Sequence, residues 1–261
     1  QAIAAAKLNG SVNFITKIGK DKNGEMALTI YNELGMNTAS IIQDEKYSTG
    51  VAGIMVNEKT GDNAINIVPG AAGTLISDDI DRNLNFIEKA QIFLTQLETP
   101  YDVTRYALKK AKEKGLVTIL NPAPACEIED DDFQLIDFFT PNETEAEFYL
   151  NKKIETEKDI KSASEQFLKK GIKNVVMTLG EKGCYFANEK ENFFINAFKL
   201  KEPVLDTTGA GDAFNGALAV GLSKDLDLEE ALKFANKVAA ISTTKQGAAA
   251  SMPSLEDLNN Y

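Results

Sequence analysis

Hydrophobic and polar positions follow two different periods along the chain. Short, mostly apolar runs that end at polar, proline or glycine residues occur at 11–19, 90–98, 115–124, 136–143 and 174–180. Such runs are typical of β-strands buried on both faces. Between them, apolar residues recur every three or four positions at 24–35, 100–115 and 157–171, which predicts amphipathic helices. The alternation predicts an α/β protein with a mostly parallel sheet covered on both faces.

The ends of the predicted strands carry polar residues. In parallel α/β proteins, ligands gather at the carboxyl ends of the strands. This chain has Glu98, Asn121, Asn142, Glu145 and Thr178 at those ends. The sequence therefore predicts a ligand site along this edge of the sheet.

One segment departs from the alternation. Residues 51–56 and 63–68 are short β-rich runs on either side of the turn-forming residues 57–62, a pattern that predicts a β-hairpin. We expect a small β lid over residues 49–70, inserted into an α/β domain that comprises residues 1–48 and 71–261. A hairpin at the edge of the main sheet is the alternative.

Composition excludes several kinds of chemistry. The 261 residues include no histidine, which removes Ser-His-Asp and Cys-His catalysis and histidine-based zinc sites. The two cysteines, Cys126 and Cys184, lie far apart and predict neither a disulfide framework nor a zinc site. A net charge of −11 argues against a nucleic-acid or membrane surface. No apolar run is as long as a membrane span, and we expect a cytoplasmic protein.

The segment DTTGAGDAFNG, at 206–216, runs directly into a helical pattern. Its glycines lack the GxGxxG spacing of dinucleotide-binding proteins, and no GxxxxGK[ST] phosphate loop occurs in the chain. The turn nevertheless predicts unpaired backbone N–H groups at the positive end of a helix dipole, where an anion can bind. Asp212 lies beside them. It either stabilises the helix start or acts as a general base toward a hydroxyl that attacks a bound phosphate.

Several motifs together resemble the ribokinase-like carbohydrate kinases, the phosphofructokinase-B family. DTTGAGDAFNGAL is similar to the family signature, STGVA to its lid strand, TQLETP to its sugar-binding glutamate segment and TPNETEAE to its magnesium and nucleotide motif. LNPAPA, TLGEKGCYF and KQGAAASMP also match, and the family order is kept over nearly the whole chain. The resemblance implies a three-layer α/β/α sandwich with a small β-hairpin lid. It also implies ATP-dependent phosphorylation of a sugar hydroxyl. D-ribose is favoured, with fructose, 2-keto-3-deoxygluconate or a nucleoside as alternatives.

The resemblance also implies catalytic and sugar-binding roles for individual residues. Asp212 is expected to be the general base, and the N–H groups of Gly209, Ala210 and Gly211 are expected to hold the transferring phosphoryl group. Asp212 and Glu98 are expected to contact the sugar. From the residues alone, Glu98 could also be a surface carboxylate after a strand.

The implied nucleotide and metal sites involve further residues. Asn142 and Glu145 are expected to organise Mg²⁺ through water, although they also form a plausible capping box. The residues expected to line ATP are Asn142, Thr178, Leu179, Gly180, Glu181, Lys182, Gly183, Gly211 and Asn236, the last of which could also be an ordinary polar helix residue. The residues that match the family's K⁺ loop, mostly through backbone carbonyls, are Asp206, Thr208, Ser242, Lys245, Gly247 and Ser251.

Two further expectations concern the start of the chain and its assembly. Family members open with a GGKGAN-like sugar loop before the helix at which this chain begins, so we expect a sugar-binding segment ahead of residue 1.

Apolar residues occupy both alternation phases of the predicted hairpin. We expect one hairpin face to cover the sugar and the other to form a homodimer. A non-catalytic nucleotide-binding relative is the alternative from another class, and the complete glycine turn with Asp212 argues against it.

Overall fold

The computed structural model describes residues 1–56 and 63–261, except for the side chains of Val56, Asn63 and Ile65. The described chain forms two compact units. We call residues 76–197 the middle unit, and residues 1–75 with 198–261 the terminal unit. The predicted turn at 57–62 lies outside the described residues. Among the described helices, none has the length and apolar character to cross a membrane.

The middle unit is built on a six-stranded sheet. The strand order is β10-β9-β8-β7-β6-β5, with β5 to β8 parallel and β9 and β10 antiparallel to their neighbours. The strands are β5 (Ile92–Thr95), β6 (Val117–Leu120), β7 (Phe138–Phe139), β8 (Asn174–Thr178), β9 (Cys184–Asn188) and β10 (Asn192–Ile195). Four of the predicted apolar runs are thus confirmed as strands.

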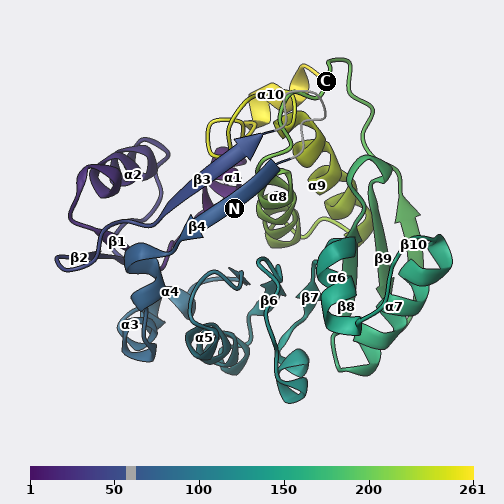
Figure 1. Cartoon of the computed structure of the whole chain (residues 1–261), viewed down its shortest axis with the longest axis horizontal. Coiled ribbons are helices and arrows are strands. Elements are labelled where there is room, and N and C mark those ends of the chain that lie inside the picture. Colours follow the sequence, from purple (N-terminus) through teal and green to yellow (C-terminus); the bar gives the residue numbers. More distant parts are fainter. Residues whose placement is uncertain (57–62) are drawn as a thin grey trace. The chain divides into compact units, whose positions relative to one another are not determined.

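Helices α5 (Tyr101–Glu113), α6 (Glu143–Leu150) and α7 (Glu157–Lys169) pack against this sheet (Figure 1). The unit also contains α3 (Ser77–Asp81), which contacts α5, and α4 (Leu84–Ile87), with short 3-10 turns η2 (Asp130–Leu135) and η3 (Gly180–Lys182). The helices predicted at 100–115 and 157–171 are confirmed as α5 and α7. Phe139 of β7 and Phe167 of α7 are fully buried and meet edge to face at 5.1 Å. Val176, on the opposite face of the sheet, is also fully buried, as expected for strands covered on both faces.

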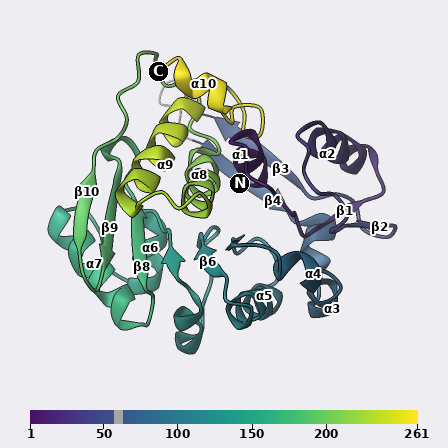
Figure 2. The ribbon, with the colours of Figure 1, turned by 180° about the vertical axis from the view of Figure 1, so that it is seen from behind.

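The terminal unit contains a parallel pair of strands, β1 (Thr16–Gly19) and β2 (Ile41–Asp44), and the helices α1 (Ala2–Lys7), α2 (Lys22–Glu33), α8 (Ala210–Ser223), α9 (Leu228–Ser242) and α10 (Leu255–Asn259). The 3-10 turn η1 (Gly70–Thr74) follows the hairpin. Figure 2 shows α8 beside α9. A side chain at Gly216 would collide with α1, and one at Gly221 would press on Ala231 of α9. Small residues therefore let these helices pack closely.

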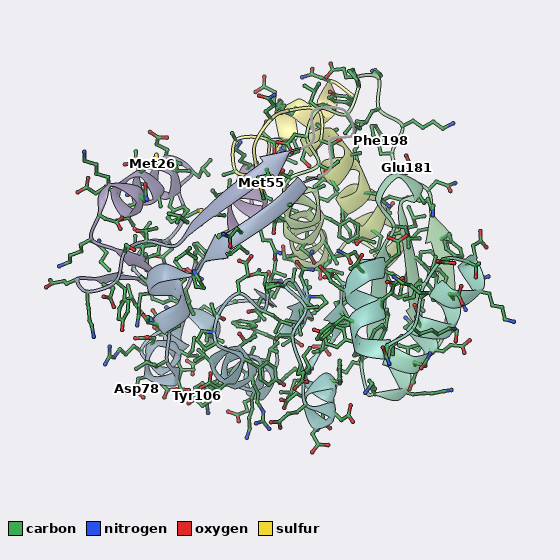
Figure 3. The ribbon with its side chains drawn as sticks, viewed as in Figure 1. Met26, Met55, Asp78, Tyr106, Glu181 and Phe198 are labelled. Atoms are coloured by element: carbon green, nitrogen blue, oxygen red, sulfur yellow. The ribbon has the colours of Figure 1, made fainter. Side chains whose placement is uncertain are left out.

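The predicted hairpin is present as β3 (Val51–Val56) and β4 (Asn63–Val68). It forms a separate two-stranded antiparallel sheet, so the alternative of an edge hairpin on the main sheet is wrong. Val51 pairs with Val68 and Ala52 with Ile67, which places Val68 and Ile67 on opposite faces. Both are exposed, by 56% and 43%. The hairpin therefore shows apolar side chains on both faces, and Met55 is labelled among them in Figure 3.

Candidate active site

The glycine turn of the terminal unit begins helix α8. Gly209 is the N-cap residue, with φ 78° and ψ 5°, and no side chain caps the helix. This left-handed conformation favours glycine. A Cβ at Gly209 would also lie 3.0 Å from the Met252 side chain. Gly211 lies in the first helical turn without a positive φ, and the positive φ of this turn belongs to Gly209.

The first turn of α8 presents an open surface. A Cβ built on Gly211 would meet no atom within 4 Å. The Ala210 N–H is one of the groups expected to hold the phosphoryl group. In the structure it donates to the Thr207 carbonyl at 3.1 Å. Among the described residues, no backbone carbonyl accepts from the N–H groups of Gly211 or Asp212. Two amides at a helix N-terminus are thus available to an anion that approaches the glycine.

Asp212 is the third residue of α8 and is half-buried. Its carboxylate makes no capping hydrogen bond, and within the described part of the chain it has no hydrogen-bond or ion-pair partner. Asp212 is therefore not an N-cap, but it lies in the first turn of α8, and the interpretation that it stabilises the helix start holds in that form. The helix dipole still favours its negative charge, and the carboxylate is available to accept a proton.

Asp206 connects the glycine turn to the loop after α9. Its two carboxylate oxygens accept from the N–H groups of Thr208 and Gly247, each at 2.9 Å. The Thr208 hydroxyl and the Gly247 and Thr208 amides lower the pKa of Asp206. The Thr243 carbonyl in turn accepts from the N–H groups of Leu205 and Asp206. Asp206 is buried, and no Lys or Arg pairs with it among the described residues.

Three of the residues matched to the K⁺ loop are thus brought together, namely Asp206, Thr208 and Gly247. Ser242 and Ser251 are buried nearby in sequence, and their hydroxyls donate to the carbonyls of Ala239 and Ala248, each at 2.7 Å. The Lys245 ammonium pairs with Asp257 at 3.0 Å. The Lys245 side chain is therefore engaged in an ion pair with α10.

In the middle unit, Asn142 and Glu145 form a reciprocal capping box at the start of α6. The Glu145 N–H donates to Asn142 Oδ1, and the Asn142 N–H donates to Glu145 Oε2, both at 2.8 Å. The capping-box alternative is confirmed. Glu145 is half-buried, and burial raises its pKa to about 7. A divalent cation nearby would favour the ionised form of this carboxylate, so the pair fits a Mg²⁺ site.

The strand ends of the middle unit line up as the parallel sheet requires. Thr178 forms a β-bridge with Asn142, and its N–H donates to the Pro141 carbonyl at 2.9 Å. The buried side chain of Asn121 donates to the Thr140 carbonyl at 3.1 Å. Glu98 is exposed just after β5. The same edge of the sheet therefore carries the strand-end residues predicted from the sequence.

The turn after β8 is shaped by two glycines. Gly180 and Gly183 have φ of 55° and 98°, and the Leu179 N–H donates to the Gly183 carbonyl at 2.8 Å. A Cβ at Gly183 would collide with the Ile195 carbonyl. Glu181 and Lys182 at the tip are exposed, and Glu181 is labelled in Figure 3. In the terminal unit, Asn236 of α9 is buried.

Sequence reasoning missed the residues that support Gly209. A Cβ there would also approach Ala248 at 3.3 Å. Ala248 and Met252 lie in the segment KQGAAASMP, one of the motifs that resemble the family. No local pattern marks these two as contacts of the glycine turn, because the contact joins segments about forty residues apart in sequence.

An α/β protein with an uncapped glycine helix start and an adjacent carboxylate has the features expected of a phosphoryl-transferring enzyme. Residues 1–255 match the pfkB family of carbohydrate kinases. The chain belongs to this family and is a carbohydrate kinase of the ribokinase type.

Individual relatives of the chain are sugar kinases as well. The chain is 39% identical over 260 residues to a ribokinase of Staphylococcus aureus (strain COL), covering 99% of this chain and 84% of the relative. It is 37% identical over 262 residues to a deoxyribokinase of Salmonella typhi, covering 100% and 85%. The structure of Arabidopsis thaliana ribokinase complexed with ribose and ATP superposes with a TM-score of 0.87 at 29% identity, covering 99% of this chain and 84% of that one. The ribokinase-like fold predicted from the motifs is confirmed.

Proposed function

We propose that the protein transfers the γ-phosphoryl group of ATP to the primary hydroxyl of D-ribose, which yields D-ribose 5-phosphate and ADP. The observation that carries the proposal is the first turn of α8. There, the Gly211 and Asp212 amides adjoin an open surface and the Asp212 carboxylate has no structural partner among the described residues. The ribokinase relative and the ribose- and ATP-bound structure support the choice of substrates.

In this mechanism, Asp212 accepts the proton of the sugar's primary hydroxyl as the hydroxyl oxygen bonds to the γ-phosphorus. The bond between that phosphorus and the β,γ-bridging oxygen breaks, and ADP leaves. Phosphoryl transfer depends mainly on positioning and charge stabilisation, so Asp212 needs no unusual base strength. The amides of the glycine turn, from Gly209 to Asp212, stabilise the charge on the transferring group. The Ala210 amide contributes only if its turn bond to Thr207 lengthens.

The remaining roles follow the family motifs. We propose that Glu98 hydrogen-bonds sugar hydroxyls. We further propose that Asn142, Asn236 and the turn 178–183 bind the nucleotide. The exposed tip of that turn and its positive-φ glycines support a surface that a planar base can approach closely.

Two cations complete the proposal. Asn142 and Glu145 would hold Mg²⁺ through water, and Mg²⁺ bound with ATP would neutralise phosphate charge. Residues 242–251, with Thr208, would hold K⁺ through backbone carbonyls. The buried Asp206 carboxylate supports this, because hydrogen bonds alone and no cationic side chain balance its charge among the described residues.

The test is a coupled assay of ADP release with ribose, 2-deoxyribose, fructose, 2-keto-3-deoxygluconate and a nucleoside. We expect the highest kcat/KM with ribose. The 37% identity to a deoxyribokinase makes 2-deoxyribose the second candidate. A higher kcat/KM with 2-deoxyribose would overturn the ribose assignment, and turnover with none of the five would overturn the proposal. Omitting Mg²⁺, or replacing K⁺ with a bulky organic cation, should lower the rate.

We also propose that the hairpin β3–β4 is a lid whose two faces have different partners. One face carries Val51, Met55 and Val68, exposed by 49%, 66% and 56%, and the other carries Ile54 and Ile67, each exposed by 43%. An isolated two-stranded ribbon with apolar side chains on both faces is unstable in water unless it is covered. We propose that the sugar site covers one face and the same hairpin of a second subunit covers the other, which gives a homodimer.

Charged substitutions on the two faces test this proposal. Light scattering should report a dimer for the protein as it exists. One of Met55→Asp and Ile67→Asp should yield a monomer, and the other should raise the sugar KM in a protein that stays dimeric. Met26→Asp, on an exposed residue of α2, is the control and should do neither. A monomer at micromolar concentration would overturn the dimer while leaving the kinase assignment intact.

A further inference from the structure

The root of the hairpin is where its two strands join the rest of the terminal unit. The chain enters through Thr49 and Gly50 and leaves through Pro69 and Gly70. A Cβ at Gly50 would lie 2.5 Å from the Pro69 carbonyl oxygen, and one at Gly70 would collide with the Ser48 carbonyl. The Ala71 N–H donates to that same Ser48 carbonyl at 2.8 Å. The entering and leaving segments are therefore in backbone contact.

A single carboxylate ties this root to another element. Asp21 caps α2 by accepting from the Gly24 N–H at 2.8 Å. The same carboxylate accepts twice from Thr49, from its N–H at 2.7 Å through Oδ2 and from its hydroxyl at 2.7 Å through Oδ1. Hydrogen bonds to an ionised acceptor are stronger than those between neutral groups. The bonds from Gly24 and Thr49 also lower the pKa of Asp21, so the carboxylate is charged at neutral pH.

Thr49 also connects Asp21 to the end of strand β1. Its Oγ1 accepts from the Gly19 N–H at 3.0 Å, at the end of β1. A Cβ at Gly19 would lie 2.6 Å from the Thr49 amide nitrogen, and one at Gly24 would collide with the Gly19 carbonyl. The end of β1, the start of α2 and the root of the hairpin thus meet without space for a side chain between them.

A second capping residue in the same unit shows that helix capping does not require this arrangement. Asp227 is the N-cap of α9 and accepts from the Glu230 N–H at 2.9 Å. That single bond is sufficient for a cap. Asp21 makes the equivalent bond and adds two bonds to a residue twenty-eight positions away. These additional bonds serve the hairpin and not the helix.

The hairpin depends on such an attachment. Within one subunit, before the sugar binds, the exposed side chains on both faces of β3–β4 contribute little packing to hold its direction. We infer that Asp21 is a positioning residue: by holding Thr49, its carboxylate fixes the direction in which β3–β4 leaves the terminal unit and thereby sets the affinity for the sugar. The inference rests on the proposed role of the hairpin as a sugar lid. Asp21 itself contacts neither substrate.

Two substitutions each remove one of the two bonds of the attachment and keep the cap. Thr49→Val deletes the hydroxyl that bonds to Asp21 and retains the amide bond. Asp21→Asn preserves N-capping, since Asn caps as well as Asp, but it places an NH₂ group where Oδ2 accepted from Thr49. Thr49→Ser keeps the hydroxyl and is the conservative rescue. Asp227→Asn is the matched control at a cap with no such attachment.

Hydrogen exchange and steady-state kinetics give the two readouts. In Thr49→Val and Asp21→Asn, amide exchange in 49–56 and 63–70 should be about threefold to tenfold faster, and the sugar KM should rise by a similar factor. The kcat and the KM for ATP should stay within about twofold. Thr49→Ser and Asp227→Asn should match the unsubstituted protein in both readouts.

The outcomes separate the inference from the proposed function. Unchanged exchange in the hairpin would overturn the inference, even in an active kinase. Faster exchange with an unchanged sugar KM would also overturn it, because the attachment would then hold the hairpin without serving the sugar. An equal loss of kcat/KM for the sugar and for ATP would indicate a general structural defect and contradict a positioning role. If the unsubstituted protein turned over no sugar, the proposed function would fail first, whatever the exchange rates.

Discussion

Helices α6 and α8 both carry an acidic residue at the third helical position, but they begin in opposite ways. In α6, Asn142 is the N-cap and Glu145 completes a reciprocal capping box. In α8, Gly209 is the N-cap, and Asp212 makes no capping bond. The first helix start pairs its Asn142 and Glu145 amides with its own side chains. The second leaves the Gly211 and Asp212 amides without a backbone acceptor in the described part of the chain.

The difference lies in the capping residue. An asparagine side chain can accept an orphan N–H, and a glycine cannot. A helix start without a side-chain cap is less stable, but its amides remain available for an anion. In these two helices, the capping residue three positions before the acid, and not the acid itself, determines whether the helix start has a structural or a chemical role.

The largest expected effect is at Asp212. Asp212→Asn keeps the size of the side chain and removes the base, so kcat should fall about 10²- to 10⁴-fold with the fold intact. Steady-state kinetics and circular dichroism measure both. Glu145→Gln is the matched change at the same position of α6 and should lower kcat only about tenfold, as is usual for a residue that acts through water on a metal. Activity of Asp212→Asn within a few-fold of the unsubstituted enzyme would contradict the catalytic assignment.

The next effect is a pH dependence at Glu145. Its pKa is raised to about 7 from an ordinary value of 4.5, because the side chain is buried. The folded protein therefore keeps a proton that the unfolded chain loses above its own pKa. This contribution to stability is complete below about pH 4.5 and is lost as the pH rises through about 7.

Glu145→Gln should remove this dependence. The variant should match the unsubstituted protein at pH 4 and exceed its free energy of unfolding at pH 8 by about 1–3 kcal/mol. Urea denaturation of both proteins across this range measures the difference. Parallel pH profiles for the two proteins would show that Glu145 titrates normally.

A pair of glycine substitutions should separate conformation from access in α8. Gly209→Ala forces a left-handed φ on a side chain and presses on Met252, so it should destabilise the protein by about 1–2 kcal/mol. Gly211→Val has space and an ordinary φ. It should leave stability nearly unchanged and weaken ADP binding in calorimetry, together with turnover. Unchanged ADP affinity and turnover in Gly211→Val would rule out anion binding at this turn.

The smallest effect concerns the cap of α6. Asn142→Ala removes the acceptor for the Glu145 N–H and should cost about 1 kcal/mol in the free energy of unfolding. Asn142→Asp retains an acceptor and should be nearly neutral. Thermal denaturation of the two variants tests the capping role separately from the proposed role in Mg²⁺ binding. Equal melting temperatures for both would show that the capping box contributes little.

Much of the fold could be predicted from local pattern. The strands β5 to β8, the helices α5 and α7 and the hairpin follow from periodicity, because burial on one or both faces imposes a period of 2 or 3.6 on the sequence. Asp21, which caps α2 by accepting from the Gly24 N–H, is also of a residue type that favours this position. The antiparallel strand β10, an edge strand with exposed residues, has no such signal and was not predicted.

By itself, the sequence determined the kinds of chemistry that were possible: no histidine, a carboxylate beside a glycine turn, and motifs in the family order. Only the tertiary structure decided which groups are free to act. Asp21 holds Thr49, and Asp206 accepts from the Gly247 N–H. The physical reason is that residue type sets what a group can donate or accept. Whether it is already engaged depends on contacts between segments that are distant in sequence, and those form only when the chain folds.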